Sequence, residues 1–314
     1  MDIAFDSEEN IIIADAGKHC LQKYYQDGRI ITLYTSKDML PSSLFVDEYD
    51  NIYFADQNDH TVKKLTKAGV MTIVAGIQDK PGSQLNQLDT PYGIYVDRNN
   101  VLYISDTANQ RIVKYLPNNQ GIQIIANASD LNLPGCVFVD ETGDGALYIS
   151  DLYNHQVLKY APGASKGIVV AGGRGFGKAL NQLYQPHAVF VDSTTGSLFV
   201  MDNGNYRFVK WSKGTEQGEL LSGTTRIISG TGIRFDSQWN LYVVDQGAKR
   251  VLTFEFNSNS FKWSKGTEQG ELLSGTTRII SGTGIRFDSQ WNLYVVDQGA
   301  KRVLTFEFNS NSCK

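Results

Sequence analysis

One stretch of the chain occurs twice without a mismatch, and no other sequence feature constrains the fold as strongly. Residues Lys210–Ser260 recur as Lys262–Ser312. Each copy contains a strand-like GIRFD, a turn, a strand-like NLYVVD, a polar loop and a strand-like RVLTFEF. This tandem duplication defines a structural unit, because self-similarity at a fixed period is the sequence signature of repeat architectures. Degenerate copies of the unit fill the rest of the chain.

Each copy is marked by two aspartates that close short apolar segments. The first aspartate ends a segment such as SLFVD, and the second ends one such as NIYFAD. A polar loop, a third segment of alternating apolar and polar residues and a poorer fourth segment follow. Four short antiparallel strands repeated roughly every 40 to 50 residues are typical of β-propeller blades. The aspartate pairs are Asp6 and Asp15, Asp47 and Asp56, Asp97 and Asp106, Asp140 and Asp151, Asp192 and Asp202, Asp236 and Asp245, and Asp288 and Asp297.

The sequence therefore predicts an all-β protein, a single β-propeller of four-stranded antiparallel blades that covers residues 1–314. The last of the seven repeat units ends without a fourth strand, whereas Gly270–Gly275 supplies one to the sixth unit. We expect a ring of seven units with a three-stranded last blade, and six-bladed closure with a surplus unit is the alternative. An unfinished blade leaves an open edge that can pair with another chain. The expected units are residues 1–36, 41–76, 91–127, 132–173, 185–223, 230–275 and 282–314.

Charge and cysteine content narrow the range of functions. The formal net charge of −4 disfavours a general nucleic-acid-binding surface, which needs a basic field. Cys20, Cys136 and Cys313 are odd in number, and their spacing matches no metal-binding or disulfide pattern. No apolar run is long enough for a membrane span, and no signal peptide is recognisable. We therefore expect no membrane insertion and leave the cellular compartment open.

The loop after the second aspartate carries a family resemblance. Asp106–Ile112 reads DTANQRI, Asp202–Phe208 reads DNGNYRF, and Pro91–Asp97 reads PYGIYVD. These segments resemble the NHL repeat, whose core is P-x-G-I-x-V-D … G-x-L-Y-V-x-D-x-x-N-x-R-I, and the resemblance covers the whole chain. The first two units depart from it, because Cys20 and Thr61 stand at the arginine position. The resemblance implies a propeller that serves as a binding platform for protein or RNA.

Elementary chemistry gives the residues of this loop a structural role. An aspartate at a strand end can accept backbone N–H bonds within the turn, and an asparagine tolerates left-handed backbone geometry. An arginine can bridge to a carboxylate of its own or a neighbouring blade. We therefore expect the repeated Asp, Asn and Arg residues to hold turns and blades together rather than to form a catalytic array.

A related, enzymatic branch of these propellers offers a different function. The chain also resembles the amidating lyase of peptide-amidation enzymes, a six-bladed propeller that holds zinc with histidines from three blades. Pro186-His187-Ala188 is similar to one ligand segment, and His155 lies in a loop that is also similar. Only two other histidines exist, His19 and His60, so we expect no three-histidine zinc site and assign no catalytic residue, metal or cofactor. The positions equivalent to His187 carry Ser42, Tyr92, Gly135, Thr231 and Thr283.

Two short motifs match catalytic patterns by letter only. Gly172–Gly177 reads GGRGFG, but a dinucleotide-binding loop runs from a strand into a helix, and here the motif lies between two strand-like segments. Gly163–Gly167 matches GxSxG, but a nucleophile elbow also needs a helix after it. We expect an inter-blade loop at the first motif and a hairpin turn at the second.

The sequence as a whole favours a non-catalytic binding platform for a protein or peptide partner. The connections Leu85–Pro91 and Leu180–Pro186 share LNQLxxP and should emerge with the aspartate loops around the channel mouth, where propeller ligands bind. A metal-dependent lyase or hydrolase at the channel is the alternative, and an RNA-binding face is the third possibility. We expect a monomer unless the open C-terminal edge pairs. The candidate binding residues are Tyr92, Asn109, Tyr153, His155, His187, Asn205 and Tyr206, and the candidate RNA contacts are Arg111, Arg174, Tyr206, Arg207, Lys249 and Arg250.

Overall fold

The computed structural model describes residues 2–8, 10–25 and 29–221, followed by separate strands between residues 230 and 306. The chain forms two compact units, residues 1–205 with 209–219 and residues 206–208 with 220–314. The regular structure is β-strand apart from two short 3-10 turns, η1 (Pro117–Asn119) and η2 (Asn203–Asn205). Within these described residues, no helix has the length and apolar character needed to cross a membrane.

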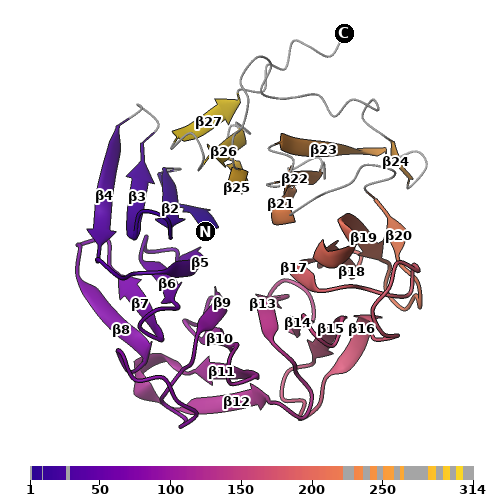
Figure 1. Ribbon diagram of the computed structural model, residues 1–314, viewed down its shortest axis with the longest axis horizontal. Coiled ribbons are helices and arrows are strands. Elements are labelled where there is room, and N and C mark those ends of the chain that lie inside the picture. The colour runs from indigo at the N-terminus through magenta and orange to yellow at the C-terminus, as the bar shows by residue number, and fades with distance from the viewer. Residues whose placement is uncertain are drawn as a thin grey trace. The chain divides into compact units, whose positions relative to one another are not determined.

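Five antiparallel sheets of four strands each account for residues 2–220 (Figure 1). In every sheet the strands are neighbours in chain order, as expected for strands joined by short hairpin turns. The first two sheets are β1 (Asp2–Phe5), β2 (Ile11–Asp15), β3 (Cys20–Tyr24) and β4 (Ile30–Thr35), then β5 (Pro41–Val46), β6 (Ile52–Asp56), β7 (Thr61–Leu65) and β8 (Met71–Gly76). The third and fourth are β9 (Pro91–Val96), β10 (Leu102–Asp106), β11 (Arg111–Tyr115) and β12 (Ile122–Ala126), then β13 (Pro134–Val139), β14 (Leu147–Asp151), β15 (Gln156–Tyr160) and β16 (Ile168–Gly172). The fifth is β17 (Pro186–Asp192), β18 (Ser197–Asp202), β19 (Arg207–Trp211) and β20 (Glu219–Leu220).

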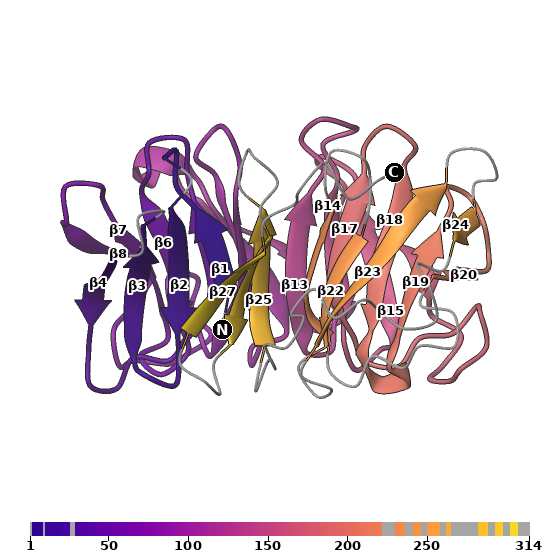
Figure 2. The same ribbon diagram turned by 90° about the horizontal axis from the view of Figure 1, so that it is seen from above.

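These five sheets are the blades of a propeller. The first strand of each sheet contacts the first strand of the next: β1 with β5, β5 with β9, β9 with β13, and β13 with β17. In Figure 1 these first strands lie toward the inside, and β4, β8, β12 and β16 lie at the periphery. Figure 2 shows the strands of these sheets standing upright, with loops at both ends. The predicted all-β propeller fold with four-stranded blades is therefore confirmed.

The second unit contains a four-stranded and a three-stranded sheet. The three-stranded sheet belongs to the last repeat, as the sequence predicts. In the sixth repeat the fourth strand is β24, which pairs with β23 through Asn257 and Lys262. The fourth strand expected at residues 270–275 lies outside the described residues, as does Cys313. The strands are β21 (Gly230–Phe235), β22 (Leu241–Asp245), β23 (Arg250–Asn257) and β24 (Lys262–Ser264), then β25 (Gly282–Phe287), β26 (Leu293–Asp297) and β27 (Arg302–Phe306).

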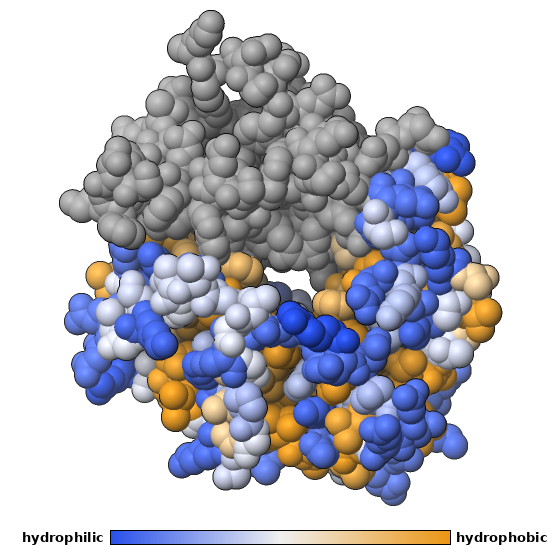
Figure 3. Space-filling model, turned by 180° about the vertical axis from the view of Figure 1, so that it is seen from behind, coloured by the Kyte–Doolittle hydropathy of each residue, from blue (hydrophilic) through white to orange (hydrophobic). Residues whose placement is uncertain are grey.

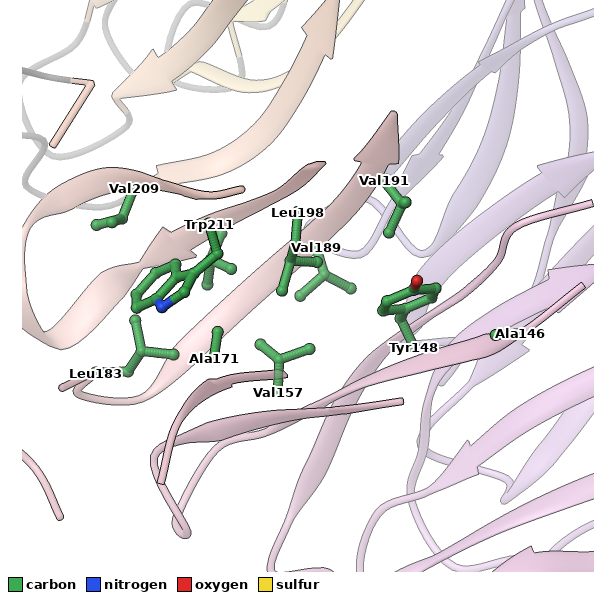
Figure 4. Close-up of a cluster of buried hydrophobic side chains, with 11 residues drawn as sticks. Ala146, Tyr148, Val157, Ala171, Leu183, Val189, Val191, Leu198, Val209 and Trp211 are labelled. Carbon is green, nitrogen blue, oxygen red and sulfur yellow. The ribbon is translucent and has the colours of Figure 1, made fainter. Parts of the chain in front are cut away.

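The hydrophobic core lies between neighbouring blades. One cluster joins Val157 and Ala171 of the fourth blade to Val189, Leu198 and Trp211 of the fifth (Figure 4). Each of these side chains is at most 5% exposed. Because full burial of a Val or Leu side chain stabilises a fold by about 1.5–3 kcal/mol, such an interface holds two blades together. The second strands β6, β14 and β18 are buried along their whole length.

The fourth strands expose single apolar side chains at the periphery. Ile30, Ile73, Ile124 and Ile168 are 43–63% exposed. Figure 3 shows apolar residues in orange among hydrophilic residues in blue on one face of the described part. Scattered exposed apolar residues are normal on protein surfaces, so these strands by themselves do not mark a binding site.

Candidate functional site

The start of each first strand and the end of each second strand lie at the same end of a blade, because the two strands are antiparallel. The inter-blade connections and the aspartate loops therefore share this end, as the sequence predicts. The hairpin turns between first and second strands lie at the other end. The opposed residues are Pro41 and Asp56, Pro91 and Asp106, Pro134 and Asp151, and Pro186 and Asp202.

A β-bulge follows the proline in each of these four first strands. In β9 the register shifts between Pro91 and Ile94, because β9 carries one more residue than β10 over this interval. The same shift occurs in β5, β13 and β17. Bulges re-aim side chains and are common next to active sites. The residues directly after the proline are Ser42, Tyr92, Gly135 and His187.

Two of these residues contact each other although their blades are not adjacent. The hydroxyl oxygen of Tyr92 on β9 lies 2.8 Å from Nε2 of His187 on β17. The ring centroids are 5.4 Å apart and the rings meet edge to face at 84°, a favourable aromatic geometry. The intervening blade carries Gly135 at the equivalent position, so it places no side chain between the two rings.

Close packing of the backbone supports this contact. A Cβ atom added to Gly93 would lie 2.4 Å from the carbonyl oxygen of Gly135, so the first strands of blades three and four approach closely there. On the other side, the Ser42 hydroxyl donates to the carbonyl oxygens of Tyr92 at 3.0 Å and Pro91 at 3.3 Å. The backbone of Tyr92 is thus held by both neighbouring blades, which fixes where its side chain begins.

The aspartate loops at the same end are held by their own side chains. The fully buried Asp106 carboxylate accepts the N–H of Asp89 at 2.7 Å, the amide of Asn109 at 2.9 Å and Nε–H of Arg111 at 2.6 Å. Arg111 also donates to three backbone carbonyls of the connection 83–87. Burial raises the pKa of the Asp106 carboxyl, and these hydrogen bonds act in the opposite direction. The predicted structural role of this loop is confirmed.

Asparagine repeats this arrangement in the fifth blade. The Asn205 amide donates to Asp202 at 2.8 Å and to the carbonyl oxygen of Gly177 at 2.6 Å. Asn109 makes the corresponding second bond to the carbonyl oxygen of Gly82 at 2.8 Å. Both amides are therefore used to fasten the loop to the preceding inter-blade connection. Arg111, one of the candidate RNA contacts, is only 6% exposed for the same reason.

Three of the four histidines share one position that sequence reasoning did not single out. His19, His60 and His155 directly precede a third strand and adopt positive φ angles of 55°, 61° and 56°. Nδ1 of His60 accepts the N–H of Thr90 at 3.0 Å, and Nδ1 of His155 accepts that of Gln185 at 3.2 Å. These two histidines fasten the next connection. The sequence does contain a signal for this shared role, because each of the three histidines stands directly before a segment that forms the third strand of its blade.

The structure shows two sets of contacts that involve the predicted binding residues. Tyr92 and His187 meet at the first strands, as described above. His155 packs instead against Phe176 and Tyr184, with ring centroids 5.7 and 5.4 Å away. Among the predicted residues, Tyr92 and His187 are the pair whose polar side-chain atoms are in printed contact.

The two remaining predicted tyrosines lie in loops. Tyr153 is 50% exposed and Tyr206 is 36% exposed. Tyr206 has a φ of 60° and stands directly before β19, the position that a histidine fills in other blades. Its backbone conformation is therefore set by the same turn.

Donor side chains for a metal ion do not gather in the part of the chain that the structure describes. Among these residues, no group of three or more His, Cys, Asp or Glu side chains is placed to hold an ion. Cys20 is buried and Cys136 is half-buried. Burial raises the pKa of the Cys20 thiol, which keeps it protonated.

Comparison with known proteins shows the fold. No protein-family model and no curated protein matches the chain. The structure is similar to a streptogramin B lyase, with a TM-score of 0.72 and 15% identity over 96% of this chain and 91% of the lyase. Virginiamycin B lyase from Staphylococcus aureus has a TM-score of 0.72 at 13% identity, over 98% and 94% of the two chains. A catalytically inactive histidine-to-alanine variant of that lyase, solved with quinupristin, has a TM-score of 0.69 at 12% identity over 97% and 91%. A gluconolactonase from Xanthomonas campestris has a TM-score of 0.57 at 13% identity, over 76% and 80%.

These comparisons correct the functional class expected from the sequence. The sequence favours a non-catalytic binding platform, whereas the similar structures just described are lyases and a gluconolactonase. The main expectation is therefore wrong, and the alternative of a lyase or hydrolase agrees better. The physical reason is that the repeat pattern encodes blades, which enzymes and binding proteins share, while function depends on a few side chains carried by the fold.

Proposed function

We propose that this protein is a β-propeller enzyme of the lyase or hydrolase class and that Tyr92 and His187 form its acid–base pair. The observation that carries the proposal is the 2.8 Å contact between the Tyr92 hydroxyl and Nε2 of His187. Groups that exchange a proton during catalysis must lie within hydrogen-bond reach of each other or of the substrate. The pair is also placed by bulges, at the end of the blades that carries the longer connections.

The pair has the chemistry to move a proton in either direction. When Nε2 is unprotonated, it accepts the Tyr92 hydroxyl proton, and the phenol oxygen can then take a proton from a substrate C–H group or from water. When Nε2 is protonated, it donates to the phenol oxygen, and the phenol proton is directed to a leaving group. An elimination and a hydrolysis each need one proton removed and one delivered. Positioned groups of this kind contribute about 10²–10⁴-fold to a rate.

The names of the similar structures support this class. Two are lyases that act on streptogramin B antibiotics by name, and a histidine-to-alanine change makes one of them catalytically inactive. A third is a gluconolactonase. Here His187 is the histidine on a first strand among the four of the chain. Because the described residues supply no set of three metal donors, we assign no step to a metal ion.

We assign the blades to the NHL type as part of the same proposal. The support comes from the loop Asp106–Ile112, in which Asp106, Asn109 and Arg111 contact one another as the repeat pattern leads one to expect. The same loop in the fifth blade pairs Asn205 with Asp202. An NHL propeller with an acid–base pair on its first strands would belong to the enzymatic branch of that architecture.

The test is a kinetic comparison of His187→Ala and Tyr92→Phe with the wild-type protein. Quinupristin and gluconolactone serve as probes, because similar structures are named for such compounds. We expect turnover of one probe, a loss in kcat of about 10²–10⁴-fold for His187→Ala, and at least as large a loss for Tyr92→Phe, because the phenol exchanges the proton with the substrate directly. Tyr49→Phe is the matched control, since Tyr49 is 62% exposed in a hairpin turn at the opposite end of its blade.

Two results would contradict the proposal. One is full activity of His187→Ala towards a probe that the wild-type protein converts. The other is an equal loss in Tyr49→Phe, which would show that the effect is not local. Thermal unfolding of each variant must match the wild type, so that lost activity is not lost fold.

A further inference from the structure

The two strands that carry Tyr92 and His187 are each entered through a residue with a left-handed backbone. Thr90 and Gln185 have φ angles of 51° and 50°, and each stands directly before the proline that begins its strand. This conformation is uncommon for residues other than glycine and persists only where the surroundings hold it. The direction in which each strand starts, and hence the place of the residue after the proline, depends on what holds this turn.

In both strands the holding group is a histidine of the preceding blade. Nδ1 of His60 in the second blade accepts the N–H of Thr90 at 3.0 Å, two residues before the tyrosine of the pair. Nδ1 of His155 in the fourth blade accepts the N–H of Gln185 at 3.2 Å, two residues before the histidine of the pair. Each bond therefore crosses from one blade to the next and acts beside one member of the pair.

Further contacts fix both rings. The His155 ring lies edge to face against Phe176 and Tyr184, with ring centroids 5.7 and 5.4 Å away. Nδ1 of His60 also lies 3.2 Å from Oδ1 of Asp89, so the ring is tied to residues 89 and 90 whichever of its nitrogens carries the proton. These contacts restrict rotation of the two rings and keep Nδ1 directed at the connection.

The intervening blade, which carries Gly135 after its proline, differs at this position. Its Leu133 forms the same left-handed turn, with a φ of 53°, but the preceding blade has Gln110 directly before its third strand. The first blade has His19, whose Nδ1 instead donates to the carbonyl oxygen of Met39 at 2.7 Å. Among the blades just compared, a histidine thus accepts the N–H before the proline in the two strands that carry the pair.

We propose that His60 and His155 are positioning residues that keep Tyr92 and His187 in hydrogen-bond contact. The inference rests on the proposed function, because it gives these two histidines a part in the same proton transfer. The Tyr92 hydroxyl and Nε2 of His187 lie 2.8 Å apart across an intervening blade, so a small shift of either strand lengthens the contact. Displacement of a reacting group by about 1 Å can cost roughly 10²-fold in rate. Neither positioning residue has to touch the substrate for this effect.

The test compares substitutions that remove or keep the Nδ1 acceptor in the full chain. Phenylalanine removes the acceptor but keeps a ring, at a position where the fifth blade has Tyr206 with a φ of 60°. Asparagine keeps an acceptor, because its Oδ1 is bonded to Cγ as Nδ1 is in histidine, and it tolerates a left-handed backbone. His19→Phe is the matched control, since His19 holds the connection to the second blade through a carbonyl oxygen.

The readout is the ring ¹⁵N spectrum of His187, which can be assigned because the chain has four histidines. Tyr92→Phe gives the Nε2 signal of a ring that has lost its partner. We expect His60→Phe and His155→Phe to move the signal towards that reference, and His60→Asn and His155→Asn to restore it. His19→Phe should leave it unchanged. With a probe that the wild type converts, the two Phe variants should lose about 10–10²-fold in kcat, and the Asn variants should recover most of it.

An unchanged Nε2 signal in both His60→Phe and His155→Phe would overturn the proposal, and so would a shift of the same size in His19→Phe. A lower unfolding temperature with an unchanged signal would show that the two histidines only stabilise the fold. Failure of the proposed function appears separately, as full turnover by His187→Ala, whatever the spectra of the other variants show.

Discussion

Two positions lie at the same end of each blade: the aspartate that ends the second strand, and the residue after the proline of the first strand. The aspartate is the same in the blades compared, whereas the other residue differs from blade to blade. The second aspartate is the same residue in blades two to five and has the same task, which is to accept a backbone N–H from the segment just before the proline that begins its own blade. The donors and acceptors are Leu40 and Asp56 at 2.9 Å, then Asp89 and Asp106, Asn132 and Asp151, and Tyr184 and Asp202, each at 2.7 Å. The residue after that proline is different in every blade: Ser42, Tyr92, Gly135 and His187.

This difference suggests separate purposes for the two positions. The aspartate holds the blade together, whereas the residue after the proline is free to vary. The aspartate position is uniform because every blade needs its connection fastened at the same point. The position after the proline is presented by the same bulge each time, yet the hydrogen bonding of the blade does not depend on its side chain. The side chain at this position can therefore differ from blade to blade without loss of the blade itself. Tyr92 and His187 are in contact because Gly135 carries nothing.

The largest loss of stability should follow from replacing the aspartate that ends a second strand. Asp106→Ala leaves the buried Arg111 guanidinium, which is 6% exposed, without its carboxylate partner at 2.6 Å. Breaking one side of a buried ion pair destabilises a protein by about 3–5 kcal/mol. Urea unfolding monitored by tryptophan fluorescence measures the change. The exposed residue Asp38 provides a control, because Asp38→Ala should change the free energy of unfolding by less than about 0.5 kcal/mol. A similar small change in Asp106→Ala would show that the loop is not held by its aspartate.

A moderate loss of stability should follow from disturbing the backbone next to Tyr92, the residue after the proline in the third blade. Gly93→Ala places a Cβ atom 2.4 Å from the carbonyl oxygen of Gly135, so one first strand must move. Overpacking of this kind costs about 1–3 kcal/mol, and the movement should also lower any activity that depends on Tyr92. Ser43→Ala is the matched control, since the second blade already carries a Cβ at this position. Unchanged stability in Gly93→Ala would mean that the close approach of the strands is not needed.

The uniform positions are also those that the sequence predicts well. Every second strand ends on the aspartate used to align the repeats, from Asp15 in β2 to Asp297 in β26. The prediction succeeds because strand length, turn chemistry and period all agree in each copy. The exact duplication contributed the period, and the structural roles of Asp106 and Arg111 followed from the chemistry of a strand end.

The candidate site could be predicted only in part. The sequence gives Tyr92 and His187 as residues at equivalent positions, but their contact crosses a whole blade and depends on a bulge and on Gly135. His19, His60 and His155 were recognisable by position, yet a search for metal ligands among histidines overlooks those that accept a backbone N–H.

The comparison between blades extends to the hairpin turns at the other end. Asp50 in the second blade and Asn100 in the third hold the same turn position, with φ angles of 62° and 59°. The left-handed turn accepts either residue, but only Asp50 carries a charge. Its carboxylate accepts the N–H and hydroxyl of Ser7 at 2.6 and 2.7 Å and Nζ–H of Lys67 at 2.7 Å. Asp50 thereby links the first blade to the second, whereas Asn100 carries no charge at the same position of the third blade.

The smallest effect should appear as a difference in acid stability. Burial alone would raise the pKa of Asp50, but hydrogen bonds from Lys67 and Ser7 outweigh it and lower the pKa from 3.8 to about 2. Because the pKa is lower in the folded state, the contact stabilises the protein above the unfolded pKa, and this contribution is lost as the pH falls towards about 2. Asp50→Asn should remove about 1 kcal/mol of pH-dependent stability, allowing for solvent screening by the exposed Lys67. Urea unfolding between about pH 6 and pH 2 measures the slope, with Asp38→Asn as the exposed control. Identical slopes for the wild type and Asp50→Asn would show that the turn position has no electrostatic role and that Asp50 and Asn100 are equivalent.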